Sequence, residues 1–161
     1  METDSIVAET ATRVFRDRCD PQAIIAARND GWMAGAWSQI EGAGLSLAWV
    51  PDDLGGAGVE IADGFAVLRE TGRLAVALPV AETLLAGWLL SRAGISSPPG
   101  AMACGPAREG DALTVAKDGM LSGRLRGIGF AKGAGHLAVL AGRGGGGTAV
   151  ALLRGEALGM G

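Results

Sequence analysis

Apolar residues in the first 95 positions of the chain recur every three or four residues, which is the spacing of amphipathic α-helices. The stretches with this spacing begin at polar residues or prolines and end at glycines or cationic turns. Their approximate ranges are 5–19, 20–29, 32–42, 60–75 and 79–94. The pattern therefore predicts about five helices in this part of the chain.

The helices expected over 60–75 and 79–94 have the clearest apolar faces. The side chains that share a face are Ile61, Phe65, Leu68 and Leu74 in the first, and Leu84, Leu85, Trp88 and Leu89 in the second. Because such faces normally turn towards a core, we expect these side chains, including Trp88, to be buried.

The character of the chain changes at residues 96–100, where two adjacent prolines interrupt all periodicity. Beyond this point short apolar runs alternate with glycines, as in strands joined by tight turns. The runs are 113–115, 120–122, 137–141 and 148–153. The sequence predicts an α+β protein: an all-helical domain over 1–96, followed by a partial antiparallel β domain over 101–161.

Composition narrows the class of protein. The 161 residues include 14 basic and 17 acidic side chains, which gives a net charge of −3, and 48% of the residues are hydrophobic. The cations are scattered, which argues against nucleic-acid binding. Two cysteines and an acidic start predict a cytoplasmic protein without a disulfide framework or a secretory leader. Pro79 and Glu82 interrupt the longest apolar stretch, so we expect no membrane span.

Four motifs have ordinary structural interpretations. The glycine-rich run 142–147 has a dinucleotide-loop spacing, but a β-branched apolar segment follows it, which favours a hairpin loop. His136 is the single histidine and has no acid at a telling spacing. Cys104 lacks a neighbouring base, and Asp52 with Asp53 reads as a solvated turn. No catalytic or metal-binding residue is predicted.

Several segments nevertheless resemble one family in their order. They are Trp37–Leu45, Val50–Gly58 with its Pro-Asp-Asp-Leu-Gly-Gly-Ala-Gly sequence, Val67–Arg73 and Pro79–Glu82. Together they are similar to the amino-terminal helical domain of the acyl-CoA dehydrogenases. The resemblance is good over residues 1–95 and weak over 101–161.

The resemblance implies a function. Family members build a helical domain, a middle β domain and a carboxy-terminal four-helix bundle, and they hold FAD between the last two. A glutamate removes the α-proton of an acyl-CoA thioester while hydride passes to the flavin, which introduces an α,β double bond. We expect this chain to end inside the middle domain, without the bundle and the glutamate, and to be inactive alone.

The flavin motifs of the family align with two segments of the second half. In the first, Cys104 stands where a threonine normally bonds the flavin. In the second, Gly127 and Gly129 replace a flavin-facing tryptophan and a threonine. By this alignment, Cys104 and Gly129 are the predicted cofactor-binding positions, and FAD is the implied cofactor.

Two functional interpretations remain open at this point. The chain is part of an FAD-dependent acyl-CoA dehydrogenase that acts together with other subunits in a homo- or hetero-oligomer. Alternatively, it is a non-catalytic helical scaffold or interaction subunit of a heteromeric acyl-CoA dehydrogenase. In the first case a complex contains flavin and oxidises acyl-CoA; in the second the chain supplies contacts only.

Overall fold

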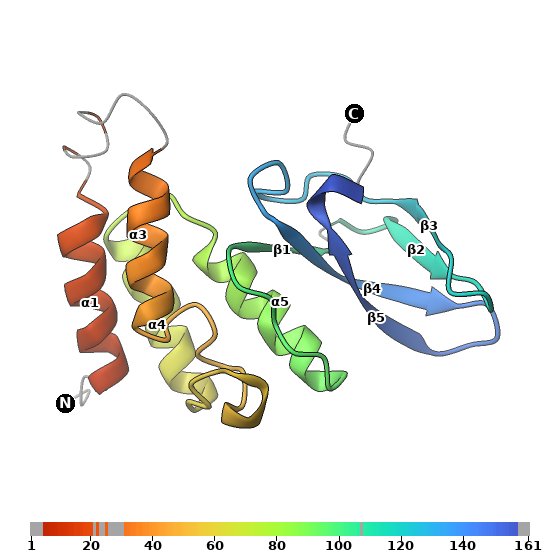
Figure 1. Cartoon of the computed structure of the whole chain (residues 1–161), viewed down its shortest axis with the longest axis horizontal. Coiled ribbons are helices and arrows are strands. Elements are labelled where there is room, and N and C mark those ends of the chain that lie inside the picture. The colour runs from red at the N-terminus through yellow and green to blue at the C-terminus, as the bar shows by residue number, and fades with distance from the viewer. Residues whose placement is uncertain (1–4, 21, 23–24, 26–30, 107, 158–161) are drawn as a thin grey trace.

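A computed structural model of the protein describes residues 5–20, 22, 25, 31–106 and 108–157. In these residues four α-helices precede a five-stranded sheet, which confirms the predicted α+β class. One helix, α5 (Val80–Arg92), lies between the other helices and the sheet (Figure 1). Among the described residues, no helix is long and apolar enough to cross a membrane.

Four of the five predicted helices agree with observed ones. Besides α5, these are α1 (Ile6–Arg18), α3 (Gly31–Gly42) and α4 (Ile61–Arg73). Most of the helix expected over 20–29 lies outside the described residues. At its start, Asp20 Oδ1 accepts a hydrogen bond of 3.0 Å from the Gln22 amide, which is the bond that an N-cap aspartate makes.

Helices α1, α3, α4 and the first half of α5 enclose one apolar core. Its fully buried members include Phe15, Ile40, Leu45, Val67 and Leu84. Each helix contributes side chains from one stripe, as the three- and four-residue spacing requires. This core fixes the first three helices as a layer that covers one side of α5.

A buried acid joins α1 to α4. The Glu70 carboxylate accepts hydrogen bonds from the Thr12 hydroxyl at 2.8 Å and from Arg73 Nε at 2.8 Å. The Glu70 side chain is only 7% exposed. The Arg73 guanidinium, followed by the Thr12 hydroxyl, lowers the pKa of Glu70 although burial opposes this change.

A glycine allows the loop after α3 to pack on α4. Trp49 donates its indole N–H to the Ile61 carbonyl at 3.2 Å and meets Phe65 edge to face, with ring centroids 5.1 Å apart. Gly64 lies directly beneath the indole, so that a Cβ atom at this position would overlap the Trp49 ring. The absence of a side chain at Gly64 therefore sets how closely this loop approaches the helix.

Four side chains that the sequence pattern placed in the core are exposed. Ile61 and Phe65 on α4 are 59% and 57% exposed, and Leu85 and Trp88 on α5 are 47% and 38% exposed. The expectation that Trp88 is buried is wrong. Because α5 is apolar on nearly every side, periodicity alone does not tell which stripe faces outwards.

The four predicted strands are present, with slightly different bounds. They are β2 (Ala112–Val115), β3 (Leu121–Arg124), β4 (His136–Arg143) and β5 (Thr148–Arg154). The structure adds β1 (Met102–Gly105), a segment without β-branched residues that the pattern did not mark as a strand. Residues 144–147 of the glycine-rich run form the hairpin loop between β4 and β5, so the predicted hairpin is present.

The sheet is mixed, so the expectation of an antiparallel sheet is wrong in this respect. Strands β2 and β3 pair antiparallel, as do β4 and β5, but β1 and β2 both pair parallel to β4. Short turns predict hairpins only between consecutive strands. The parallel pairs form because residues 125–135 connect the end of β3 to the start of β4, which then runs in the same direction as β1 and β2. No local sequence pattern predicts such a connection.

Strand β4 organises the sheet. Strand β5 pairs along one edge of β4, and the other edge is shared by β1, opposite residues 136–139, and β2, opposite residues 142–143. On one face, Met102 and Ala138 pack against Leu90 of α5. On the other face, Ala103 and Val139 lie under the segment that follows β3.

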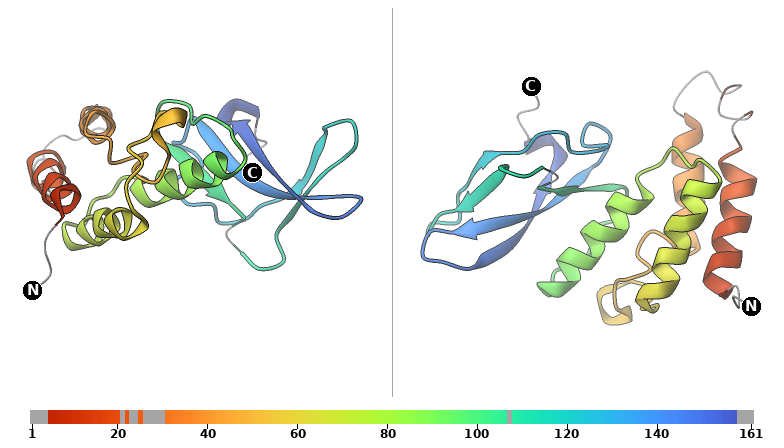
Figure 2. Two further views of the ribbon diagram at one scale, coloured as in Figure 1. Left: turned by 90° about the horizontal axis from the view of Figure 1, so that it is seen from below. Right: turned by 180° about the vertical axis from the view of Figure 1, so that it is seen from behind.

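Helix α5 and β1 are joined by a buried threonine. The Thr83 hydroxyl donates to the Met102 carbonyl at 3.2 Å and accepts from the Met102 amide at 3.0 Å. Thr83 is 1% exposed and Met102 is fully buried. This pair connects the helical layer to the sheet, and Figure 2 shows α5 against the sheet with the other helices beyond it. The separation of 1–96 and 101–161 into two domains stays a prediction.

The packing beneath Trp49 gives a first testable prediction. Gly64→Ala is expected to destabilise the protein by about 1–3 kcal/mol, because the new methyl group must displace the indole. The matched control is Gly72→Ala on the same helix, where an added Cβ meets no atom within 4 Å. This control is expected to raise stability slightly, since alanine favours helices. Chemical denaturation measures both changes, and equal effects of the two substitutions would contradict the packing.

The buried acid predicts how stability depends on pH. Because folding lowers the Glu70 pKa from its ordinary value of 4.5, the ionised group stabilises the fold above that pH, and this stability is lost as pH falls through the folded-state pKa. Glu70→Gln is therefore expected to flatten the loss of stability below pH 4.5, whereas the exposed control Asp53→Asn leaves it unchanged. Urea unfolding at several pH values measures the free energy of unfolding. If this free energy falls equally steeply below pH 4.5 in wild type and Glu70→Gln, the prediction is refuted.

Candidate functional site

The two predicted cofactor positions lie near the same end of the sheet. An added Cβ at Gly105, the last residue of β1, would lie 2.9 Å from Ile128 Cδ1 and 3.1 Å from Leu125 Cδ1. The segment that leads to Gly129 therefore covers the end of β1 that carries Cys104. The first residues of α5 complete this region, because Glu82 lies against Gly129.

The Cys104 side chain is half-buried among apolar groups. It packs with Ala86, Leu90 and Ala138 between α5 and the sheet. Burial raises the pKa of the thiol, while a backbone hydrogen bond at Gly105 acts in the opposite direction. A neutral thiol is a weak hydrogen-bond donor and a poor nucleophile. The structure thus confirms the interpretation of Cys104 as a small, semi-buried side chain.

Charged side chains lie beside Gly127 and Gly129, the positions that the alignment matches to the tryptophan and the threonine of the family motif. An added Cβ at Gly129 would lie 3.2 Å from Glu82 Oε1, and one at Gly127 would lie 2.7 Å from Arg108 Nε. In both cases the three nearest atoms all belong to that charged side chain. A carboxylate and a guanidinium therefore border the two glycines, which no spacing in the sequence indicated.

An ion pair holds the segment in place. Asp111 accepts hydrogen bonds from the Arg126 amide at 2.5 Å and from Arg126 Nε at 2.7 Å. These bonds from Arg126 lower the pKa of Asp111, with a smaller contribution from the charge of Arg108. Asp111 thereby supports the segment that leads to Gly129.

Phe130 is a further feature that the sequence did not reveal. Its φ of 56° lies in the left-handed region that bulky residues rarely adopt. The Phe130 carbonyl accepts hydrogen bonds from the Gly133 and Ala134 amides, both at 3.0 Å, so the turn explains the backbone conformation. The ring is 47% exposed beside Gly129. The only signal for it was an aromatic residue within a glycine-rich segment.

The side chains at the predicted positions do not fit a flavin ring. Such a ring has carbonyl and nitrogen groups that need hydrogen-bond partners, and the charge near them tunes its chemistry. Cys104 turns its thiol into an apolar cluster, and Gly129 offers only backbone groups beside the Glu82 carboxylate. Negative charge that develops on a ring placed there would be opposed by this carboxylate. The assignment of Cys104 and Gly129 to a cofactor site stays a prediction.

The remaining candidates have structural surroundings. His136 is half-buried at the start of β4, where it pairs with Met102 and Arg154 across the two neighbouring strands. Asp52 and Asp53 are exposed in a short 3₁₀ turn, as expected. Within the described ranges, no group of three or more His, Cys, Asp or Glu side chains could hold a metal ion.

Comparison with known sequences gives a consistent family. The family described as "Acyl-CoA dehydrogenase, N-terminal domain" matches residues 1–96. Acyl-CoA dehydrogenase IpdE2 of Mycobacterium tuberculosis is 30% identical over 142 residues, which cover 84% of this chain and 44% of the relative. Its counterpart in Mycolicibacterium smegmatis is 31% identical over 100 residues, which cover 60% of this chain and 32% of the relative.

Solved structures with the same fold are also available. A variant of the Tcur3481-Tcur3483 steroid ACAD superimposes with a TM-score of 0.73 at 23% identity, covering 92% of this chain and 46% of that one. The ChsE4-ChsE5 complex from Mycobacterium tuberculosis gives a TM-score of 0.68 at 22% identity, covering 96% and 47%. These similarities show the fold.

The chain spans less than half the length of each of these relatives. The family match nevertheless covers more than half of this chain, and it includes all the helices described above. The chain therefore belongs to the acyl-CoA dehydrogenase family.

Proposed function

We propose that the chain is one component of an FAD-dependent oxidoreductase that introduces an α,β double bond into an acyl-CoA thioester. The observation that carries this proposal is the family match over residues 1–96. Other polypeptide supplies the catalytic glutamate, the helical bundle and the main contacts to the flavin. We place the assembly in the cytoplasm, and the isolated chain is inactive.

An outward apolar stripe on α5 supports a role in the acyl pocket. Leu85 and Trp88 lie on this stripe, at 47% and 38% exposure. Leu140 is 40% exposed on β4 and, by strand alternation from Ala138, lies on the sheet face that α5 covers. Apolar side chains that remain open to solvent mark surfaces that bind a ligand or a partner. In this proposal they form one wall around the acyl chain and exclude water from it.

The names of two structural neighbours suggest what the assembly contains. One is a steroid ACAD, and the other is a complex of two differently named chains. By analogy, we propose a hetero-oligomer with other acyl-CoA dehydrogenase subunits and a bulky, steroid-derived acyl-CoA as the substrate class. Fold similarity alone does not specify a substrate, so this part of the proposal rests on the names.

A second candidate function is that of a non-catalytic scaffold subunit. The position of Glu82 and Arg108 against the two glycines favours it, because these charged groups replace the aligned flavin-facing side chains. In this case a partner holds the entire flavin and the reacting part of the substrate. This chain then acts only by supporting the partner through its helices.

The test uses the tagged full chain, produced in the presence of a candidate partner subunit. The purified complex is expected to show flavin absorbance and to reduce a dye when acyl-CoA is added. Leu85→Lys is expected to lower acyl-CoA oxidation by the complex about tenfold or more, because the bound acyl chain would bury an unpaired ammonium, which is costly. Circular dichroism checks that this variant is folded.

The matched control is Met120→Lys, which places the same charge at a position 67% exposed in the turn before β3. It should leave flavin content and activity unchanged. Acyl-CoA oxidation that Leu85→Lys leaves unchanged would favour the scaffold function, because the partner then holds the reacting part of the substrate by itself. Complexes that never contain flavin with any acyl-CoA dehydrogenase subunit would refute both.

A further inference from the structure

The backbone of Phe130 is strained. Its φ of 56° is left-handed, and the other positive-φ positions in the described ranges, apart from Ala75, are glycines. One of these glycines, Gly127, belongs to the same segment. A Cβ atom makes the left-handed conformation unfavourable, whereas glycine adopts it without strain. A phenylalanine at position 130 therefore lowers the stability of this turn relative to a glycine.

The ring of Phe130 adds little packing within the chain. It is 47% exposed and lies outside the three apolar clusters that the described residues form. The one aromatic pair among these residues joins Trp49 to Phe65 and does not include it. Strained residues of this kind are typical of positions where the side chain contacts a ligand. The ring is thus better explained by a contact outside the chain than by the fold.

The position of Phe130 relative to α5 suggests what it contacts. Phe130 follows Gly129, where an added Cβ would lie 3.2 Å from Glu82 Oε1. Glu82 and Leu85 are three residues apart on α5, so they are neighbours on the helix surface. Trp88 follows at the next turn, and the helix rises by about 9 Å from Glu82 to Trp88. The Phe130 backbone therefore lies beside the start of the outward apolar stripe of α5.

This stripe has an aromatic side chain near each end. Phe130 is beside its start, Leu85 follows, and Trp88 lies one turn further along. Aromatic side chains present broad, flat apolar surfaces and pack well on other rings. A rigid ring system loses little conformational freedom on binding, whereas a linear acyl chain must fix each of its bonds. Such a wall favours an acyl group that contains rings.

We infer that Phe130 is a specificity-determining residue whose ring packs on a ring system in the acyl group of the substrate. This inference rests on the proposed oxidoreductase function, in which Leu85 and Trp88 contact the same acyl group. Phe130 then limits the acyl pocket at the first turn of α5. Because the contact is with the acyl group alone, it affects the choice of substrate and not the chemistry at the thioester.

The first test separates backbone strain from the contribution of the ring. Phe130→Ala and Phe130→Gly both remove the ring, but only alanine keeps the strain. In an unstrained loop the glycine variant is the less stable one. Here we expect the reverse, with Phe130→Gly melting about 2–4 °C above Phe130→Ala. Ala75→Gly, at the other strained position, should also raise the melting temperature. A lower melting temperature for Phe130→Gly than for Phe130→Ala would overturn the inference.

The second test uses the full chain in complex with a partner subunit. It compares kcat/KM for a steroid-derived acyl-CoA and for a linear acyl-CoA. Phe130→Gly is expected to lower kcat/KM for the steroid compound about tenfold or more, mainly through KM. The value for the linear compound should stay within about twofold. Phe130→Tyr keeps a ring and should restore the preference. Equal losses on both substrates, or no loss, would overturn the inference.

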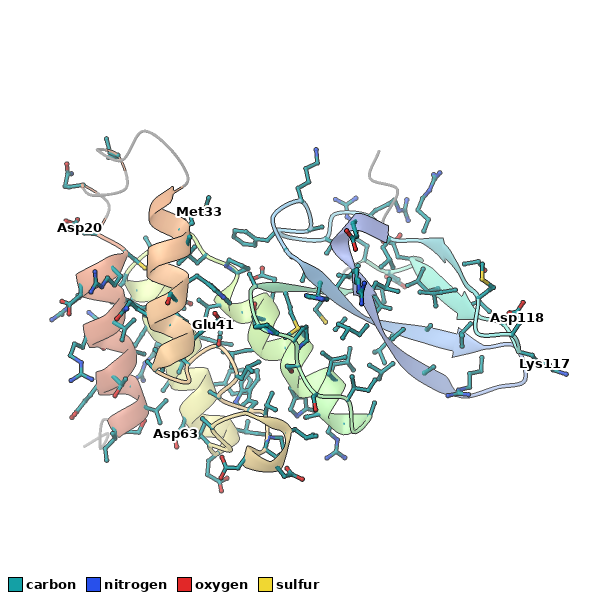
Figure 3. The ribbon with its side chains drawn as sticks, viewed as in Figure 1. Asp20, Met33, Glu41, Asp63, Lys117 and Asp118 are labelled. Carbon is teal, nitrogen blue, oxygen red and sulfur yellow. The ribbon has the colours of Figure 1, made fainter. Side chains whose placement is uncertain are left out.

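Two controls accompany these measurements. Ala75→Gly changes a strained backbone away from α5 and should leave both substrates unaffected. Met120→Ala removes an apolar side chain that is 67% exposed in the turn between β2 and β3. Figure 3 labels Lys117 and Asp118 of this turn at the end of the sheet far from α5. This variant should also leave both substrates unaffected, and a loss equal to that of Phe130→Gly would overturn the inference.

The outcomes separate this inference from the proposed function. A complex that oxidises acyl-CoA with the same substrate preference in wild type and Phe130→Gly overturns the inference and leaves the function intact. A wild-type complex that binds both compounds but oxidises neither refutes the function. Calorimetric binding then decides the inference, which requires that Phe130→Gly weakens binding of the steroid compound alone. A complex that binds neither compound refutes both.

Discussion

The structure depends on the position of α5 between two cores. Val80 and Leu84 on one side of the helix complete the helical core, and Ala86 and Leu90 on another side cover the sheet. The Thr83 hydroxyl adds two buried hydrogen bonds to Met102, and breaking them would leave polar groups without partners in an apolar interior. Because the same helix serves both layers, the two parts of the chain hold each other in register.

The same arrangement explains why α5 is central to function. With two sides committed to packing, the helix has one remaining apolar side, which contains Leu85 and Trp88. Neighbouring apolar side chains that stay open to solvent are typical of binding surfaces. Beside the beginning of this helix, Glu82 and Arg108 give the end of the sheet a charged rather than an aromatic lining. The apolar side therefore suits substrate or partner contacts, and the charged end does not suit a flavin ring.

Much of the fold could be predicted because its signals are local. The spacing of apolar residues and the residues that end each segment predicted α4 and α5 nearly to the residue. The glycines after Arg143 predicted the β4–β5 hairpin. The direction of Trp88 and the parallel pairing of β1 could not be predicted, since both depend on segments distant in sequence. At the candidate site, alignment identified Cys104 and Gly129. Their neighbours Glu82 and Arg108 come from other elements, and only folding reveals them.

The shared edge of β4 has a consequence for the order of synthesis. Strands β1, β2 and β3 leave the ribosome before β4 exists, and β1 and β2 both need the same edge of it. Until β4 begins to emerge at residue 136, only the β2–β3 hairpin can pair, and the backbone groups of β1 have no strand beside them. The helical layer precedes β1 in the chain, so it can assemble first and shelter Met102. The arrival of β4 thus joins β1 to the β2–β3 hairpin in one late step, and β5 follows it onto the remaining edge.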